Sequence, residues 1–337
     1  MTRLALTAFA CLAAMTAAAP SALAQFKDRT VKLSAAVPQD HPFGAGAAAL
    51  TACVAEKSGG KIKIQGFWNA QLGSDQQAVQ AVRSGTLDIV VASTSPLVGL
   101  VPALGVFDLP FLVTNEKEAD ALLDGPVGQK MSERLLAVGL VNLTYWENGF
   151  RNMTNSRRPV QKWEDIQGMK VRVMQNNVFL DTFSNMGATA VPLAYGELYT
   201  ALETKAIDGQ ENPYANIYSA KFYEAQKFLS ITQHAYTPAV VMYSKRLWDQ
   251  LSTEEQEAFT ACATTSRVKQ RQVNREQATE SLAMLKKAGM VVNEVAPSEL
   301  ARMRDKAQAV YQKHAAVIGQ DTLDAVQVQL KAVRGTN

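Results

Sequence analysis

Apolar residues alternate between strand-like and helix-like spacing along the first third of the chain. Residues 31–37 and 61–67 are typical of strands, the second with clear period-two alternation, and residues 87–93 are almost continuously apolar, as in a strand buried on both faces. An alanine-rich helix is predicted over residues 43–58, where a Gly-Gly pair stops it, and Asp75 is predicted to cap a second helix. This alternation is typical of a doubly wound α/β sheet with right-handed crossovers.

The same pattern begins again in the middle of the chain. Strands are predicted over residues 140–146 and 169–174, and helices over residues 177–186 and 195–204. A later apolar strand, residues 239–244, is expected to return to the first sheet. The C-terminal part is charged and helical, with helices predicted at about residues 253–287, 301–318 and 322–333.

These patterns predict an α/β protein with two lobes, each a doubly wound sheet flanked by helices. No low-complexity linker is present, so crossing strands and a long helix must join the lobes. Lobe I is expected to hold residues 25–147 and about 238–277, and lobe II residues 148–237 and about 278–337. Two lobes joined in this way form a hinged clamp, and ligands of such sheets bind between the lobes at the strand ends.

The first 24 residues have the features of a cleavable export signal. Arg3 gives a positive start, residues 4–20 carry no charge, and Ala22-Leu23-Ala24 fits the small-x-small cleavage pattern. We expect cleavage after Ala24 and export to the periplasm. A membrane anchor is the alternative, but the apolar run of about 17 residues is short for a spanning helix and rich in alanine.

The charge of the chain is nearly balanced. It has 34 Lys+Arg and 31 Asp+Glu, and without Arg3 the remaining 33 against 31 leave a net charge of about +2. This balance argues against nucleic acid or an anionic membrane as a partner. The 313 residues that follow the signal (337 less 24) are too many for one simple core, which agrees with two lobes.

Two cysteines follow the predicted signal, Cys53 and Cys262. An oxidising compartment would allow them to pair, but both lie in predicted helices, and the sequence does not decide whether these helices meet. Neither cysteine has C-x-x-C spacing or a nearby histidine, which argues against a catalytic cysteine or a metal site.

Motifs of catalysis and cofactor binding are missing from the sequence. The three histidines, His41, His234 and His314, lie far apart, and there is no H-E-x-x-H, G-x-S-x-G, Walker lysine loop or G-x-G-x-x-G after a strand. We therefore predict a binding protein without enzyme activity, cofactor or metal. A periplasmic lyase or hydrolase acting on organic acids is the alternative from a different class.

Polar residues at strand ends indicate how a ligand would be held. In the predicted strand 169–174, Arg172 points to the face opposite the two neighbouring valines. It is either an exposed strand residue or part of a carboxylate clamp, since a guanidinium offers a fixed fork of donors at any relevant pH. Arg151 follows another strand, and Asn212 lies at the end of a third, where its amide can both donate and accept.

Six short segments follow one another in a characteristic order. They are N-A-Q-L-G-S-D (69–75), F-D-L-P-F (107–111), W-E-N-G-F-R-N-M-T (146–154), G-M-K-V-R-V (168–173), V-P-L-A-Y-G-E-L-Y-T-A-L-E-T (191–204) and I-D-G-Q-E-N-P (207–213). Together they resemble the solute-binding proteins of tripartite ATP-independent periplasmic (TRAP) transporters, of the DctP type. The resemblance covers nearly the whole chain after the signal.

The resemblance implies a two-lobed periplasmic-binding-protein clamp that closes over an organic acid. The acid would then pass to the membrane permease subunits of a TRAP transporter, driven by an ion gradient. In that family the arginine of the K-x-R strand, here Arg172, holds the substrate carboxylate, and Arg151 assists. Asn212 would bond the substrate, and Tyr195 would line the pocket, unless it is a core residue. The family also implies a monomer.

Further contacts are expected from both lobes. The candidate set is completed by Gln39 and His41 of the first loop, Ser93 and Thr94 at a strand end, and Gln175 and Glu211 of the second lobe. His41 is alternatively only a helix cap. Glu211 either balances an arginine or bonds a substrate hydroxyl, and the sequence does not separate these roles.

The amides and small hydroxyls of this set favour a sugar acid, with one carboxylate and several hydroxyls, over a C4-dicarboxylate. Residues 145–156 and 219–230 are similar to relatives that take diketogulonate or uronates. A C4-dicarboxylate is the alternative ligand. A receptor that reports its ligand to a membrane sensor kinase is the alternative role.

Overall fold

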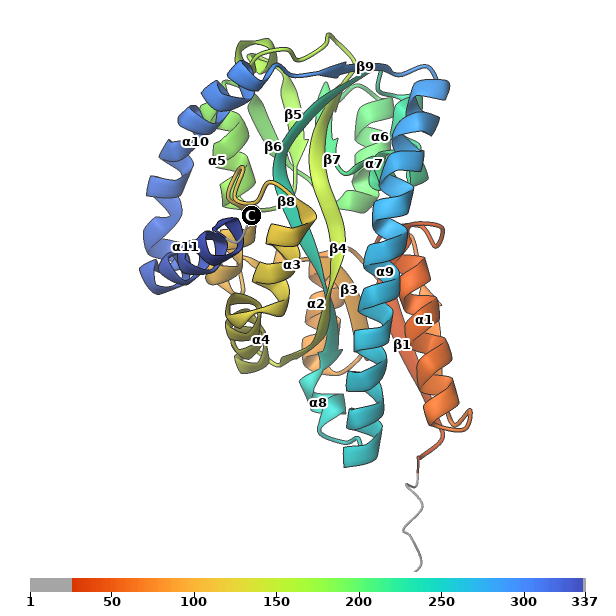
Figure 1. The fold of residues 1–337 in the computed structure, drawn as a ribbon. Helices are drawn as coiled ribbons and strands as arrows, with labels where there is room; N and C mark the ends of the chain where they lie inside the picture. Colours follow the sequence, from red (N-terminus) through yellow and green to blue (C-terminus); the bar gives the residue numbers. More distant parts are fainter. Residues whose placement is uncertain (1–25, 336–337) are drawn as a thin grey trace, which may run out of the picture.

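The computed structural model describes residues 26–335, so the predicted export signal lies outside the described residues. Within this range, no helix combines the length and the hydrophobicity that are needed to cross a bilayer. Figure 1 shows helices on both sides of a long, twisted sheet, with α9 (Thr253–Lys287) running beside it over much of its length.

One hydrogen-bonded sheet of nine strands runs through the described residues, in the order β2-β1-β3-β8-β4-β7-β5-β6, with β9 on β8. Parallel strands β1 to β3 form one end, and parallel strands β5 to β7 form the other. Two long antiparallel strands, β4 (Leu140–Asn155) and β8 (Phe228–Ser244), join them. The short strands are β1 (Arg29–Ala35), β2 (Ile62–Phe67), β3 (Ile89–Ser93), β5 (Lys170–Val173), β6 (Thr189–Pro192), β7 (Gly209–Asn212) and β9 (Val291–Glu294).

The long strands correct the sequence prediction. The strand predicted over residues 140–146 continues to Asn155, and the strand predicted over residues 239–244 begins at Phe228. Polar residues such as Asn152 interrupt the hydrophobic pattern, so the pattern did not predict these extensions. The two parallel groups therefore share one sheet through β4 and β8. As expected, the last part of β8 returns to the first group, where it pairs with β3.

Strand β3 is buried on both faces, as its apolar sequence predicted. Ile89 and Val91 pack into a core with residues of α1 and α9, such as Leu50. Val90 and Ala92 belong to a second core on the opposite face. This double burial positions the end of β3 firmly, and that end lies in the ligand site described below.

The helices near the first strands begin at identifiable caps. Helix α1 (Pro42–Lys57) starts where His41 Nδ1 accepts a hydrogen bond from the backbone N–H of Phe43. Helix α2 (Asp75–Ser84) is capped by Ser74, one residue before the expected cap. Ser74 and Gln77 form a reciprocal capping box, which satisfies two backbone donors at once, and Asp75 is therefore free for another role.

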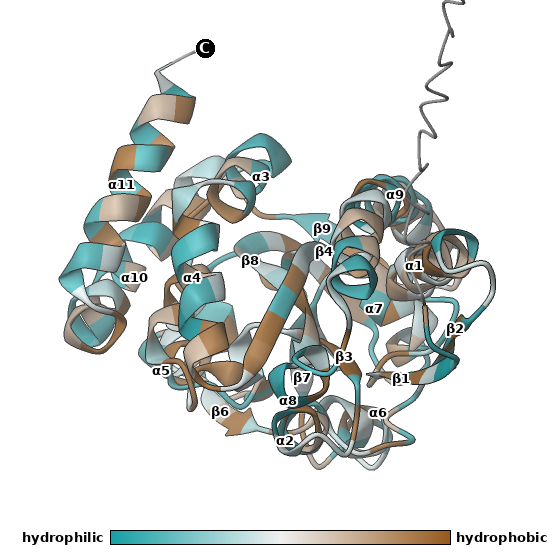
Figure 2. Ribbon diagram, turned by 90° about the horizontal axis from the view of Figure 1, so that it is seen from below, coloured by the Kyte–Doolittle hydropathy of each residue, from teal (hydrophilic) through white to brown (hydrophobic). Residues whose placement is uncertain are grey.

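The remaining helices cover the sheet. Helix α9 has the predicted ends, and α5, α6, α10 and α11 overlap predicted helices, whereas α3, α4, α7 and α8 were not predicted. Figure 2 shows hydrophobic strands in the middle of the molecule, with α10 and α11 on one side and α1 and α9 on the other. The helices are α3 (Glu116–Asp124), α4 (Pro126–Ala137), α5 (Asn177–Asn185), α6 (Leu198–Glu203), α7 (Tyr214–Ser219), α8 (Lys245–Trp248), α10 (Pro297–Ile318) and α11 (Gln320–Arg334).

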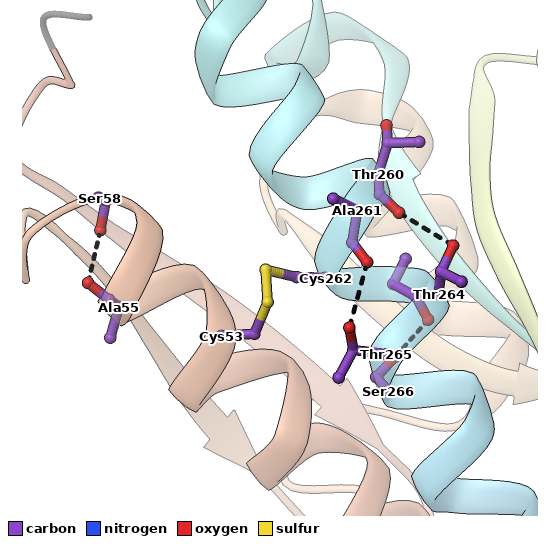
Figure 3. Close-up of a disulfide and its surroundings, with 10 residues drawn as sticks. Cys53, Ala55, Ser58, Thr260, Ala261, Cys262, Thr264, Thr265 and Ser266 are labelled. Carbon is purple, nitrogen blue, oxygen red and sulfur yellow. Dashed lines mark hydrogen bonds between the residues drawn. A yellow bond between two sulfur atoms is a disulfide. The ribbon is translucent and has the colours of Figure 1, made fainter.

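A disulfide joins Cys53 of α1 to Cys262 of α9 (Figure 3). The sequence left this pairing open, because it depends on a contact between helices 209 residues apart. The bond fastens the first half of α9 to α1.

Replacement of Cys53 and Cys262 together by Ser should lower the free energy of unfolding by about 2 to 5 kcal/mol, since the closed loop is long. Urea unfolding of both proteins with and without reductant measures this effect. The wild type should lose stability with reductant, whereas the double variant should not respond. Equal stability of the two oxidised proteins would contradict the prediction.

Candidate ligand-binding site

A cavity lies at the carboxyl ends of both parallel strand groups. Ala36 after β1 and Ser93 of β3 contribute to one wall, and Arg172 of β5 and Asn212 of β7 to another; Asn148 comes from the long strand β4. Ligands of α/β sheets bind at such strand ends. The other lining residues are Val37, Phe43, Asp75, Val91, Ala92, Pro96, Met174, Gln175, Leu193, Ala194, Tyr195 and Asn216.

Arg172 is buried in the wall of the cavity, with only 2% of its surface exposed. This placement excludes the alternative of an exposed strand residue. Its Nε and Nη2 donate to the carbonyl oxygen of Leu193 at 2.9 and 2.7 Å, whereas Nη1 has no partner among the described residues. Burial lowers the pKa of Arg172 to about 10, so the side chain keeps its charge at neutral pH. A buried cation with an unused donor suits an anionic ligand.

Arg151 lies behind the cavity wall and is held by Glu211. Its Nε and Nη2 donate to the two carboxylate oxygens, and His234 Nε2 lies 3.1 Å from Glu211 Oε2. Burial acts to raise the pKa of Glu211, but Arg151 and His234 outweigh it and hold the pKa below its ordinary value. In this arrangement Glu211 balances the charge of an arginine, which is one of the two roles that the sequence left open.

Asn212 connects this buried pair to the cavity. Its Oδ1 accepts from Arg151 Nη2 at 3.1 Å, and its Nδ2 donates to Gln210 Oε1 at 2.5 Å. Arg151 and Glu211 do not line the cavity themselves, and Asn212 is the lining residue that Arg151 contacts directly.

Three of the four expected first-lobe residues, Gln39, His41 and Thr94, are absent from the cavity lining. Ser93 lines the cavity, but Thr94 is buried beside it with no place in the lining. Gln39 is exposed and lies in a separate groove between α1 and β2. The first loop is irregular, so no periodicity could show which way the side chain of Gln39 points.

His41 serves as a helix cap and also contacts the cavity wall from behind. Because its Nδ1 accepts from Phe43, its Nε2 carries the proton and donates to Asn216 Oδ1 at 3.1 Å. Burial lowers the pKa of His41 to about 4, so the ring is neutral. This bond spans 175 residues of sequence and ties the start of α1 to α7.

Gln175 and Tyr195 both line the cavity, as expected. Gln175 is exposed, whereas the Tyr195 hydroxyl is buried and has no hydrogen-bond partner among the described residues. The Tyr195 ring packs edge-on against Phe222 with 5.7 Å between centroids, and burial raises the pKa of its hydroxyl. The ring is thus part of the core and of the cavity wall at once.

Three polar residues of the lining are absent from the predicted set: Asp75, Asn148 and Asn216. Asp75 was interpreted only as a helix cap. Burial raises its pKa to about 6, although the nearby charge of Arg172 acts in the opposite direction. Asn216 follows Asn212 by four residues, and this spacing after a strand end is the signal that could have found it.

Residues 26–335 contain no group of three or more His, Cys, Asp or Glu side chains placed to hold a metal ion. The polar side chains of the cavity are amides, the hydroxyls of Ser93 and Tyr195, one carboxylate and one guanidinium. They can hold an anion by its charge and hydroxyls by hydrogen bonds.

Residues 33–317 match the model of the family DctP, described as bacterial extracellular solute-binding protein, family 7. The chain belongs to this family. The match confirms the resemblance to TRAP solute-binding proteins that the six segments carried.

Some relatives of this chain are named for the ligand that they bind, or have a ligand in their crystal structure. The 2,3-diketo-L-gulonate-binding periplasmic protein YiaO of Escherichia coli is 38% identical over 237 residues, which are 70% of this chain and 72% of YiaO. The crystal structure of the sugar acid binding protein DctPAm from Advenella mimigardefordensis with galactonate is 42% identical, with a TM-score of 0.90 over 92% of this chain and 100% of that one. A TRAP solute-binding protein from Polaromonas with D-erythronate is 37% identical, with a TM-score of 0.85 over 88% and 98%.

Substitution of Glu211 by Gln should destabilise the fold by about 3 to 5 kcal/mol, because it leaves Arg151 buried without a full counter-charge. Urea unfolding at neutral pH measures the loss. The matched control is Arg157→Ala, which removes a half-exposed ion pair with Asp208 and should cost less than about 1 kcal/mol. Similar losses of stability in the two variants would show that the buried ion pair contributes no more to the free energy of unfolding than the half-exposed pair.

Proposed function

We propose that this protein is a periplasmic receptor that captures a sugar acid and delivers it to the permease subunits of a TRAP transporter. In this proposal the chain is exported, its signal is removed after Ala24, and the mature protein acts as a monomer without nucleic acid, cofactor or enzyme activity. Family membership and the solute-binding relatives support the transport role.

The observation that carries the proposal is the unpartnered Nη1 of Arg172 in the cavity wall. Two of its three guanidinium nitrogens are held by the Leu193 carbonyl, so the side chain is already oriented before a ligand arrives. A ligand carboxylate would supply the missing acceptor and the missing negative charge together. Asn212, with its orientation set by Arg151, is proposed to bond the same ligand.

The carboxylate of Asp75 favours a sugar acid over a dicarboxylate. A hydroxyl of the ligand can donate to this carboxylate, whereas a second ligand carboxylate would meet its like charge. The amides of Asn148, Gln175 and Asn216 add donors and acceptors suited to a polyol chain. The relatives with galactonate, D-erythronate and diketogulonate support this choice.

Ligand capture is proposed to close a clamp formed by lobe I (residues 25–147 and about 238–277) and lobe II (residues 148–237 and about 278–337). Both groups of parallel strands contribute residues to the cavity, and this arrangement supports the division into two lobes. Strands β4 and β8 and helix α9 run from one group to the other, so these elements would contain the hinge.

Galactonate should raise the melting temperature of the wild type, and Arg172→Met should weaken its binding by about 2 to 5 kcal/mol, roughly 30-fold or more. Isothermal titration calorimetry with galactonate, D-erythronate, diketogulonate, glucuronate and succinate gives both the affinity and the preferred class. Arg157→Ala replaces an exposed arginine outside the cavity lining, so it is the control and should bind normally. A preference for succinate would show that the ligand is a dicarboxylate and not a sugar acid. Unchanged affinity of Arg172→Met would show that Arg172 does not hold the ligand carboxylate.

The preference for galactonate over galactarate should fall as the pH is lowered from 7.5 to 5. The two acids differ only in that galactarate carries a second carboxylate in place of the terminal hydroxymethyl group. The raised pKa of Asp75, about 6, means that this residue takes up a proton within the range, and the repulsion is then lost. Titrations at both pH values test this, and Asp75→Asn should show a low, pH-independent preference. A constant wild-type ratio would count against the role of Asp75.

A further inference from the structure

Strand β4 contains a bulge where it passes the cavity. Glu147 is opposite Pro238 and Gly149 is opposite Thr237, so Asn148 is the extra residue between two matched pairs. Gly149 has φ 117°, a conformation that a residue with a side chain rarely adopts. A bulge re-aims a side chain, and here the displaced residue is the one that lines the cavity.

Asn148 has one partner and one unused group. Its Nδ2 donates to Ser93 Oγ at 3.0 Å, which links β4 to the end of β3 inside the cavity. Its Oδ1 is buried and has no partner among the described residues. A buried amide oxygen without a donor is costly, so a ligand hydroxyl at this place would satisfy it.

The edge of β4 opposite β8 lacks a neighbouring strand at the bulge, because β7 pairs only with Asn152–Asn155. Gln270 of α9 takes the place of that strand. Its Oε1 accepts from the backbone N–H of Glu147 at 2.8 Å, and its Nε2 donates to the carbonyl oxygen of the same residue at 2.8 Å. Gln270 is fully buried, so these two bonds satisfy backbone groups that water cannot reach.

The next turn of α9 holds the Glu147 side chain. Asn274 Nδ2 donates to Oε1 at 2.9 Å, and Arg275 Nη2 donates to Oε2 at 2.9 Å. On the other side, a Cβ at Gly46 of α1 would lie 2.9 Å from Gln270 Cβ and 2.8 Å from the Trp146 ring. Helix α9 therefore packs closely against β4 at the bulge. Glu147, the residue before Asn148, is held through both its backbone and its side chain.

We propose that Gln270 is a positioning residue for ligand binding, which holds the bulge so that Asn148 presents its Oδ1 to a hydroxyl of the bound acid. Gln270 does not line the cavity and acts only through the backbone of Glu147 and the neighbouring Asn148. The proposal rests on the proposed sugar-acid function and adds a specificity determinant to it. The chemistry recognised is a hydroxyl donor on the chain of the acid, away from the carboxylate held by Arg172.

A double-mutant cycle tests the proposal, with galactonate as the probe and calorimetry as the readout. Asn148→Ala and Gln270→Met should each weaken binding roughly 10-fold, and the double variant should bind about as weakly as either single variant, because both changes remove one interaction. Gln272→Ala, an exposed glutamine on the same helix, is the matched control and should bind like the wild type. Additive losses in the cycle would overturn the proposal, since Gln270 would then act independently of Asn148.

A ligand-free crystal structure tests the role of Gln270 independently of the sugar-acid function. In Gln270→Met, or in Gln270→Glu if the methionine variant does not fold, the Asn148 Nδ2–Ser93 Oγ bond should be lost. If that bond stays at its wild-type length, Gln270 does not position Asn148 and the proposal is wrong. Failure of the wild type to bind galactonate would instead refute the sugar-acid function, whatever the fate of the Asn148–Ser93 bond.

Discussion

Burial of two neighbouring guanidinium groups is the constraint on which the site depends. Arg151 of β4 and Arg172 of β5 lie in the same half of the sheet, and the carboxylate of Glu211 is paired with Arg151. A buried charge without a partner is costly in a protein interior. Arg172 keeps an unpaired Nη1 in the cavity wall, and the carboxylate of Asp75 belongs to the same lining. A ligand carboxylate would give this Nη1 the acceptor that the described residues do not supply.

The architecture of the sheet brings the residues of the site together. Strands β3, β5 and β7 are short and largely buried, and β3 runs in the opposite direction to β5 and β7, so their carboxyl ends meet at one cavity. The long strands β4 and β8 connect the two ends of the sheet, and β4 contributes Asn148 to the cavity lining. A ligand in the cavity would thus contact a strand that also connects the two groups of parallel strands.

The sequence predicted the repeating α/β order, the long helix α9 and the place of Arg172 among the residues of the candidate site, because each depends on local periodicity or on a strand end. It missed the length of β4 and β8, whose polar residues are buried by contacts distant in sequence. It placed Gln39 and Thr94 in the site, although neighbouring residues in an irregular loop or at a strand end can point in different directions. The position of Asn148 depends on a bulge that no local pattern encodes, whereas Asn216 could have been found from its spacing of four residues after Asn212.

The bond between Cys53 and Cys262 gives the molecule an order of maturation. Its second sulfur comes late in the chain, so the bond can form only after most of the polypeptide has been made and α9 has docked on α1. In a reducing compartment the two thiols would stay separate, and α9 would be held by packing alone. The disulfide-bonded form is therefore expected only in an oxidising compartment such as the periplasm, where relatives are found. Copies that remain in a reducing compartment would be recognisable by their two free thiols.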